Sequence, residues 1–249
     1  PAHLTRVGID PLCKLYENYY PPGVIVIPSY FSAGLITKRF PNRKAKVITS
    51  FAMMYDLEDP CSFAIEIASL LDRNNGIWVF EQSYLPTMME RVSFDTVCHE
   101  HIEYYCLKQI EWLLKNAGLR IISLEFNEVN GGSLSVVAAH TESKYPIAYG
   151  TVKEVLSNEK KFGLDELDIY ATFRFDIAEA CAAIKQFCLI AKLEKKRICA
   201  LGASTKGNVL LQYCGLNSND IEVIGEINPD KFGAYTPGSH IPIEEESRV

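Results

Sequence analysis

The sequence predicts an α/β protein made of two units in succession, each with βα connections and parallel strands. Apolar runs of strand length alternate with segments of helical period from Asp10 onward, which is the pattern of βαβ units and a parallel sheet. A turn sequence, Asn130-Gly131-Gly132, then favours an antiparallel hairpin, and a new strand–turn–helix pattern begins at Arg197. A chain of 249 residues, 48% of them hydrophobic, is long enough to bury the cores that two units need.

The individual elements follow from these runs in chain order. The expected strands are the closing part of a buried strand at 6–9, then 24–27, 46–50, 76–81, 119–126, 133–139, 197–201 and 221–227. The expected helices are 61–71, 108–117, 168–193 and 208–213. Gly118 should end the second of these helices as a C-cap.

In two stretches the apolar residues follow neither helical nor strand spacing. About two dozen residues after Glu81 form a long polar and aromatic connection, which inside a compact domain is usually functional. Residues 140–165 are polar and are expected to be irregular, so we place the domains at 1–140 and 141–249. Almost nothing precedes the first strand, and the first sheet is therefore expected to be incomplete at its N-terminal side and the second unit to be truncated.

The amino-acid composition argues against nucleic acid and membranes as partners. A formal net charge of -6, with scattered Lys and Arg, removes the electrostatic basis of nucleic-acid binding. No apolar run reaches the length of a membrane span and no signal peptide is recognisable, so a cytoplasmic protein with no membrane partner is expected. The eight widely spaced cysteines form no CxxC pair and are expected to be reduced thiols.

The densest chemistry lies in Cys98-His99-Glu100-His101 and the following Tyr104-Tyr105. Two of the five histidines flank a carboxylate here, in a connection that leaves the carboxyl end of a parallel strand, where open α/β sheets bind ligands. A histidine can act as a general base near neutral pH, and a carboxylate beside it can orient it. A metal site using His99 and His101 is the rival hypothesis, but no further ligand pair with metal-site spacing completes it.

Other motifs are weaker. Asp10 follows a strand at a position where a carboxylate can bind ribose hydroxyls, although an acidic residue before proline is also an ordinary turn. The turn from Gly202 to Gly207 lies between a strand and a helix, where backbone N–H groups and Lys206 could hold a phosphate or where the glycines could simply allow a tight turn. Tyr55, after the strand at 46–50, could touch a ligand or serve in packing.

Taken in order, several segments resemble the sugar C-methyltransferase family. They are Gly8–Pro11, Ile48–Leu57, Trp78–Leu85, the HEH stretch with Tyr104-Tyr105, Gly202–Asn208 and Pro237–Pro242. The match covers nearly the whole chain, and the HEH and GASTKGN stretches are specific in combination. The resemblance implies a Rossmann-like class I methyltransferase core, followed by a C-terminal Rossmann-like substrate domain, without the family's zinc-binding N-terminal domain, first strand and glycine-rich loop.

The resemblance also implies an activity, namely transfer of a methyl group from S-adenosylmethionine to a carbon beside the ketone of a nucleotide-linked keto-deoxysugar. It implies His101 as general base, and Glu100, His99 and Tyr104 in supporting catalytic roles. The expected cofactor-binding residues are Asp10, Tyr30, Phe31, Ser50 and Tyr55. The expected substrate-binding residues are Tyr84, Asn130, Ser204, Lys206 and Asn208, and no metal ligands are expected.

Two other hypotheses stay open. A metal-dependent hydrolase or lyase would use the HEH stretch, and a non-catalytic domain would bind a nucleotide sugar without turning it over. In each case a monomer or weak oligomer is expected.

Overall fold

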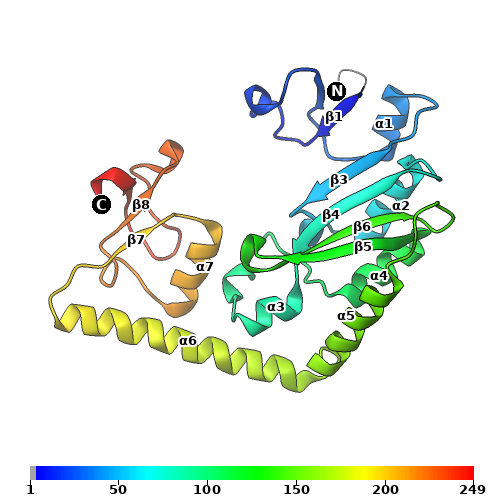
Figure 1. Cartoon of the computed structure of the whole chain (residues 1–249). Coiled ribbons are helices and arrows are strands. Elements are labelled where there is room, and N and C mark those ends of the chain that lie inside the picture. Colours follow the sequence, from blue (N-terminus) through cyan, green and yellow to red (C-terminus); the bar gives the residue numbers. More distant parts are fainter. Residues whose placement is uncertain (1–3) are drawn as a thin grey trace.

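The structure is a computed structural model that describes residues 4–249, and it confirms the α/β class (Figure 1). The strands are β1 (Arg6–Ile9), β2 (Val24–Ile27), β3 (Val47–Phe51), β4 (Ile77–Ser83), β5 (Leu119–Asn127), β6 (Ser133–His140), β7 (Cys199–Leu201), β8 (Val223–Glu226) and β9 (Ile243–Glu245). The helices are α1 (Ala33–Arg39), α2 (Pro60–Leu70), α3 (Leu85–Glu90), α4 (Leu107–Asn116), α5 (Tyr149–Phe162), α6 (Leu167–Leu193) and α7 (Thr205–Cys214).

The N-terminal residues form a small unit of their own. β1 and β2 pair in parallel, with Arg6 opposite Val24 and Ile9 opposite Ile27, and they make a sheet separate from β3. The expected strand at 6–9 exists, but it is not buried, because Arg6 and Val7 are exposed. Among the described residues up to 46, only Cys13 is fully buried. This unit therefore has almost no core of its own.

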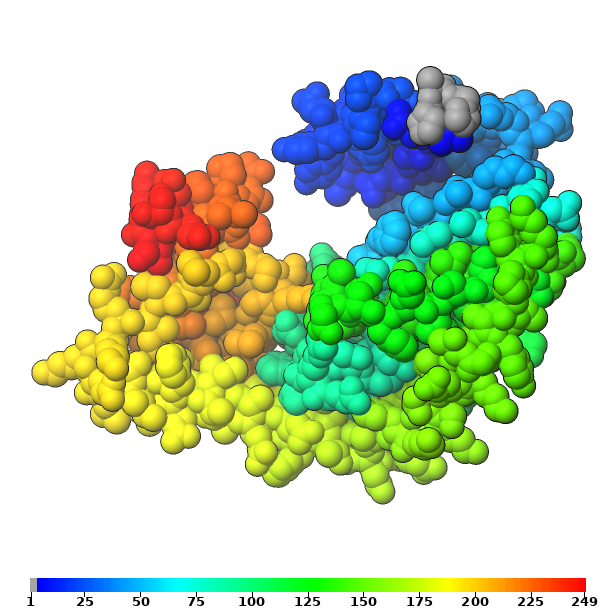
Figure 2. Space-filling view, viewed as in Figure 1, coloured from blue at the N-terminus to red at the C-terminus, as the bar shows by residue number. Residues whose placement is uncertain are grey.

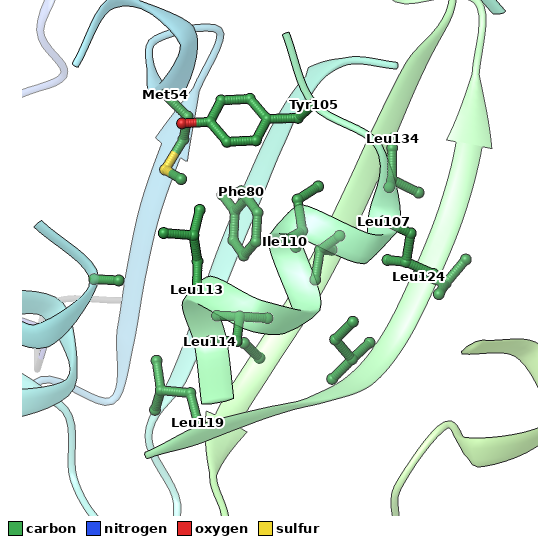
Figure 3. Packing of buried hydrophobic residues seen from close by; sticks show 14 of the residues in the cluster. Met54, Phe80, Tyr105, Leu107, Ile110, Leu113, Leu114, Leu119, Leu124 and Leu134 are labelled. Carbon is green, nitrogen blue, oxygen red and sulfur yellow. The ribbon is translucent and has the colours of Figure 1, made fainter. Parts of the chain in front are cut away.

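The central sheet has the order β3-β4-β6-β5. β3 and β4 are parallel, while the hairpin β5–β6 joins antiparallel to β4, as the turn sequence predicts. Alternate β4 residues, Trp78 and Phe80, are buried against the helices on one face of the sheet. Figure 3 shows α4 lying on this face, with Ile110 and Leu114 directed at Phe80 and its neighbours.

Residues 140–165 are not irregular throughout, because 149–162 form the helix α5, and this corrects the sequence prediction. α5 forms because Val152, Val155 and Glu159 recur at helical spacing and are buried on one face, and Gly163 ends the helix in the left-handed conformation. This buried face packs on α4 and β5. Residues that the sequence assigned to the second unit thus complete the core of the first.

The C-terminal unit contains a second parallel sheet with the order β7-β8-β9. α6 and α7 cover it, and their buried side chains meet Ile224 and Ile243 of the sheet in one hydrophobic cluster, which we call the C-terminal core. The strand β9 was not predicted from the sequence. The 27-residue helix α6 links the two units along one side of the molecule (Figure 1).

The molecule is open. Its accessible surface is 15299 Å² for a mass of 28.0 kDa, whereas a compact monomer of that mass exposes about 11,000 Å². Figure 2 shows a notch between the N-terminal residues and the C-terminal unit. No helix within residues 4–249 is both long and apolar enough to cross a membrane.

Candidate active site

The candidate active site lies where β3 and β4 end. These strands are parallel, so the loops that follow them leave from the same edge of the sheet. The first loop carries Tyr55 in a 3-10 turn, and the second carries the HEH stretch between α3 and α4. The topology therefore brings the two loops together at the edge where ligands bind.

His101 is held in one tautomer by the loop that contains it. Its Nδ1 lies 2.7 Å from the backbone carbonyl oxygen of Thr96. A carbonyl oxygen can only accept a hydrogen bond, so in the neutral ring Nδ1 carries the proton and Nε2 has the lone pair. The ring is half-buried, and its free nitrogen is the one that a general base needs.

Tyr55 supports the histidine in two ways. Its ring is buried and lies 4.1 Å from the His101 ring, between centroids, at an interplanar angle of 47°. Its carbonyl oxygen accepts hydrogen bonds from the N–H groups of Ile102, at 2.9 Å, and Glu103, at 3.2 Å. The structure thus places Tyr55, expected to bind cofactor, directly against the candidate base.

A small cavity adjoins these residues. Its volume is about 10 Å³, and its lining includes Tyr55, Met88, Thr96, His101 and Tyr104. This is the room that one water molecule occupies. A sugar is far larger, so a substrate has to reach His101 from its exposed side.

Tyr104 contributes a protonated hydroxyl to the site. Burial raises its pKa above the ordinary value, and the nearby Cys98 thiol raises it further. The hydroxyl makes only long hydrogen bonds, 3.5 Å to the carbonyl oxygen of Thr96 and 3.4 Å to that of His101. It is therefore able to turn and donate to a ligand oxygen.

The charged groups around His101 include one that the expected site did not contain. Burial raises the pKa of Asp56, His101 lowers it and Glu100 raises it, which places the Asp56 carboxyl within electrostatic range of both. The side chains of His99 and Glu100 are 84% and 58% exposed, and their nearest atoms are 4.0 Å apart. Both face solvent rather than the cavity.

Tyr84, expected to bind substrate, lies elsewhere. Its ring is buried, and its hydroxyl donates to Glu159 of α5 at 2.8 Å. Burial raises the pKa of this phenol first, and the Glu159 charge raises it further. Its polar atom is already satisfied inside the core, and its role in substrate binding stays a prediction.

The expected cofactor residues occupy two parts of the fold. The Asp10 carboxylate follows β1 and accepts the Leu12 N–H at 2.7 Å through Oδ1, while Tyr30 is 80% exposed. Phe31 packs against Phe63, with ring centroids 5.0 Å apart. Ser50 of β3 accepts a hydrogen bond from the Trp78 indole at 3.0 Å.

The remaining substrate candidates gather at the start of α7. The Ser204 hydroxyl caps this helix by accepting the Gly207 N–H at 3.0 Å. The Lys206 ammonium donates to the carbonyl oxygen of Asn130, in the β5–β6 turn, at 3.3 Å. Asn208 Oδ1 is buried without a hydrogen-bond partner among the described residues. The hairpin turn of the first unit thus meets the helix start of the second.

Thr96 could not be predicted as a site residue from the sequence. It acts through its backbone carbonyl, which any residue provides, so residue type carries no information about it. Within residues 4–249, no group of three or more His, Cys, Asp or Glu side chains is arranged to hold a metal ion. The Nδ1 atom of His101 is occupied by the Thr96 carbonyl, so Nε2 is the ring nitrogen that remains for a ligand or a proton.

The fold is that of an α/β protein with a histidine loop at the edge of its central sheet, and sequence comparison assigns it to the methyltransferases. Residues 5–124 match the family model described as a methyltransferase domain. Residues 128–249 match the model described as a C-methyltransferase C-terminal domain. The chain therefore belongs to the family that joins these two domains, and the resemblance seen in the sequence is confirmed.

A curated relative and several solved structures are similar to this chain. C-methyltransferase NovU of Streptomyces niveus is 30% identical over 241 residues, which are 95% of this chain and 56% of NovU. LepI, in a complex with SAM, matches at 16% identity and a TM-score of 0.44, over 55% of this chain and 36% of LepI. Magnesium protoporphyrin IX methyltransferase of Synechocystis matches at 14% identity and a TM-score of 0.36, over 51% of this chain and 57% of its own. Both TM-scores are below 0.5, so the family assignment rests on the sequence matches.

Proposed function

We propose that this protein is an S-adenosylmethionine-dependent C-methyltransferase whose substrate is a nucleotide-linked keto-deoxysugar. The methyl group goes to a carbon beside the ketone, and His101 is the general base. The family match supports the reaction class. The assignment of His101 as the general base rests on the hydrogen bond from its Nδ1 to the Thr96 carbonyl, because this bond leaves Nε2 free to accept a proton.

The chemistry fits the groups at the site. A carbon beside a ketone becomes nucleophilic when it loses a proton, and the resulting charge moves to the ketone oxygen. His101 Nε2 takes the proton, and the protonated Tyr104 hydroxyl donates to the oxygen. Glu100 and His99, at the open side, would orient sugar hydroxyls as the substrate approaches.

The residues that would hold the cofactor are compatible with it. Asp10 uses Oδ1 for the Leu12 N–H, so its second oxygen can accept a ribose hydroxyl. The exposed Tyr30 ring and the adjoining Phe31 offer aromatic surface for a base, and Ser50 and Tyr55 lie at the end of β3 and in the loop after it. The cofactor supplies an electrophilic methyl group.

The start of α7 suits the phosphates of a nucleotide. Its first turn presents unpaired N–H groups, Lys206 adds a positive charge, and Ser204 and Asn208 add polar groups. Asn130 lies opposite, in contact with Lys206. These four residues are the proposed nucleotide-binding set.

The cytoplasm is the proposed place of action, because all eight cysteines are free thiols and such thiols persist in a reducing compartment. A monomer or weak oligomer stays a prediction.

Replacing His101 tests the proposal. Incubation with methyl-labelled S-adenosylmethionine and a panel of nucleotide-linked keto-sugars should transfer label to carbon, and His101→Gln should lower kcat by about a hundredfold to ten-thousandfold. His240→Asn is the matched control, since His240 is exposed and its positive φ of 54° suits asparagine. Nucleotide-sugar binding without label transfer in the unaltered protein would favour the non-catalytic hypothesis instead.

A further inference from the structure

Phe94 belongs to the loop of the first unit, but its side chain lies in the core of the second. The ring is only 6% exposed and is part of the C-terminal core, together with Cys181, Cys188 and Leu211. Its centroid is 5.4 Å from that of Tyr213 on α7. The 3-10 turn Phe94–Thr96 and α7 pack directly on each other.

The same short turn fixes the candidate base. Thr96, two residues after Phe94, provides the carbonyl that accepts the His101 Nδ1–H at 2.7 Å. Thr96 is itself buried, and its hydroxyl donates to the Ser93 carbonyl at 2.9 Å. The Val97 N–H also donates to the Phe94 carbonyl, at 3.0 Å. Phe94, which packs in the C-terminal core, and Thr96, which accepts from His101, therefore belong to one hydrogen-bonded turn.

A second contact fixes how the two units meet. Lys206, at the start of α7, donates to the Asn130 carbonyl in the hairpin turn at 3.3 Å. α7 therefore touches the first unit at an apolar point on the Phe94–Thr96 turn and at a polar point on the hairpin.

We propose that Phe94 is a positioning residue through which the C-terminal unit holds His101 in its Nδ1-protonated form. The expected effect of Phe94 on catalysis rests on the proposed function, whereas its expected effect on the His101 tautomer does not. Without the aromatic anchor, the turn is free to move, and the Thr96 carbonyl no longer faces Nδ1. Part of the imidazole population then carries its proton on Nε2, where it cannot act as a base.

The direct test is the tautomer of His101 in the complete chain. Long-range ¹H–¹⁵N spectra of histidine-labelled protein separate the two tautomers, and His101→Gln identifies the resonance among the five histidines. We expect the unaltered protein to show Nδ1–H only, Phe94→Ala to show both tautomers, and Phe94→Leu to restore most of the Nδ1–H form. Unchanged tautomers in Phe94→Ala would overturn the proposal.

Ile243→Ala is the matched control, because Ile243 is 5% exposed in the same C-terminal core but lies on β9, away from the turn. It should leave the His101 tautomer unchanged. If Ile243→Ala shifted the His101 tautomers as much as Phe94→Ala does, the cause would be a general weakening of the C-terminal unit, and the proposed role of Phe94 would be refuted.

Kinetics provide the second readout. Phe94→Ala should lower kcat by about a hundredfold with little change in KM, since small misplacements of a catalytic group have effects of that size. Phe94→Leu should recover most of kcat. If the unaltered protein methylates no keto-sugar, the proposed function fails, whereas the tautomer spectra still decide the role of Phe94.

Discussion

A single carboxylate, Glu226, holds the C-terminal sheet edge together. It lies at the end of β8 and accepts the N–H groups of Ala203 at 2.9 Å, Ile227 at 2.8 Å and Asn228 at 3.0 Å. These hydrogen bonds lower its pKa from the ordinary 4.5 to about 2, and burial opposes them. The carboxylate thereby joins the turn before α7 to the loop after β8.

This pKa predicts an acid dependence of stability. The folded-state pKa is below the unfolded value, so the stabilisation is complete above about pH 4.5 and is lost as the pH falls toward about 2. Glu226→Gln should lower the denaturation midpoint of the C-terminal unit at neutral pH, and the difference from the unaltered protein should shrink over that acid range. Glu244→Gln, an exposed neighbour on β9, should change little at any pH. A difference that persists at about pH 2 would contradict the mechanism.

Residue type decides how much of the site the sequence can predict. His101 stands out because histidines are rare and two of them flank a carboxylate in a loop at the sheet edge. Thr96 and Phe94 do not stand out, because one acts through its backbone and the other packs against a helix more than a hundred residues later. The partner of Tyr84 could not be predicted either, because Glu159, which accepts its hydroxyl, lies 75 residues later in the chain.

At the scale of elements, Glu159 ties α5 to α4. Its buried carboxylate accepts the N–H groups of Leu107 at 2.5 Å and Lys108 at 3.1 Å, and the Tyr84 hydroxyl at 2.8 Å. It thus caps the N-terminus of α4 from another helix, where a negative charge is also favoured by the helix dipole.

Removal of this cap should be costly. Glu159→Ala leaves buried donors unpaired and should lower the free energy of unfolding by about 1–3 kcal/mol. Tyr84→Phe should lower it by about 1 kcal/mol, and the double variant should be less destabilised than the sum, because the two side chains share one hydrogen bond. Urea denaturation measures all three. Glu154→Ala, at an exposed position of α5, is the control, and equal losses at 154 and 159 would refute the capping role.

Helix α5 also shows where sequence patterns are overlooked. Its apolar residues Val152, Val155 and Leu156 have helical spacing, but the Lys and Glu between them and the Ser, Asn and Glu after them make the stretch look like a polar linker. The pairing of β3, β4 and the hairpin was easier to predict, because continuous apolar runs and an Asn-Gly-Gly turn specify strands and a hairpin.

At the scale of the whole molecule, stability is unevenly distributed. The central sheet and α4 share a large core, whereas between residues 4 and 46 only Cys13 is fully buried. β1 and β3 are not hydrogen-bonded to each other, and each has one unpaired edge.

The N-terminal unit should therefore open without unfolding the rest. It is attached mainly through α1, whose first N–H, at Ala33, donates to Glu66 of α2 at 2.7 Å, and through the Phe31–Phe63 ring contact. Segments with few buried apolar contacts exchange their amide hydrogens by local opening at low free energy.

Hydrogen–deuterium exchange read by mass spectrometry should show β1 and β2 exchanging well before β4 and β6. Glu66→Gln weakens the attachment and should speed exchange in residues 24–39 while leaving β4 unchanged, whereas the exposed Glu58→Gln should alter neither. Equal protection of β2 and β4 in the unaltered protein would show that the N-terminal unit and the central sheet open together.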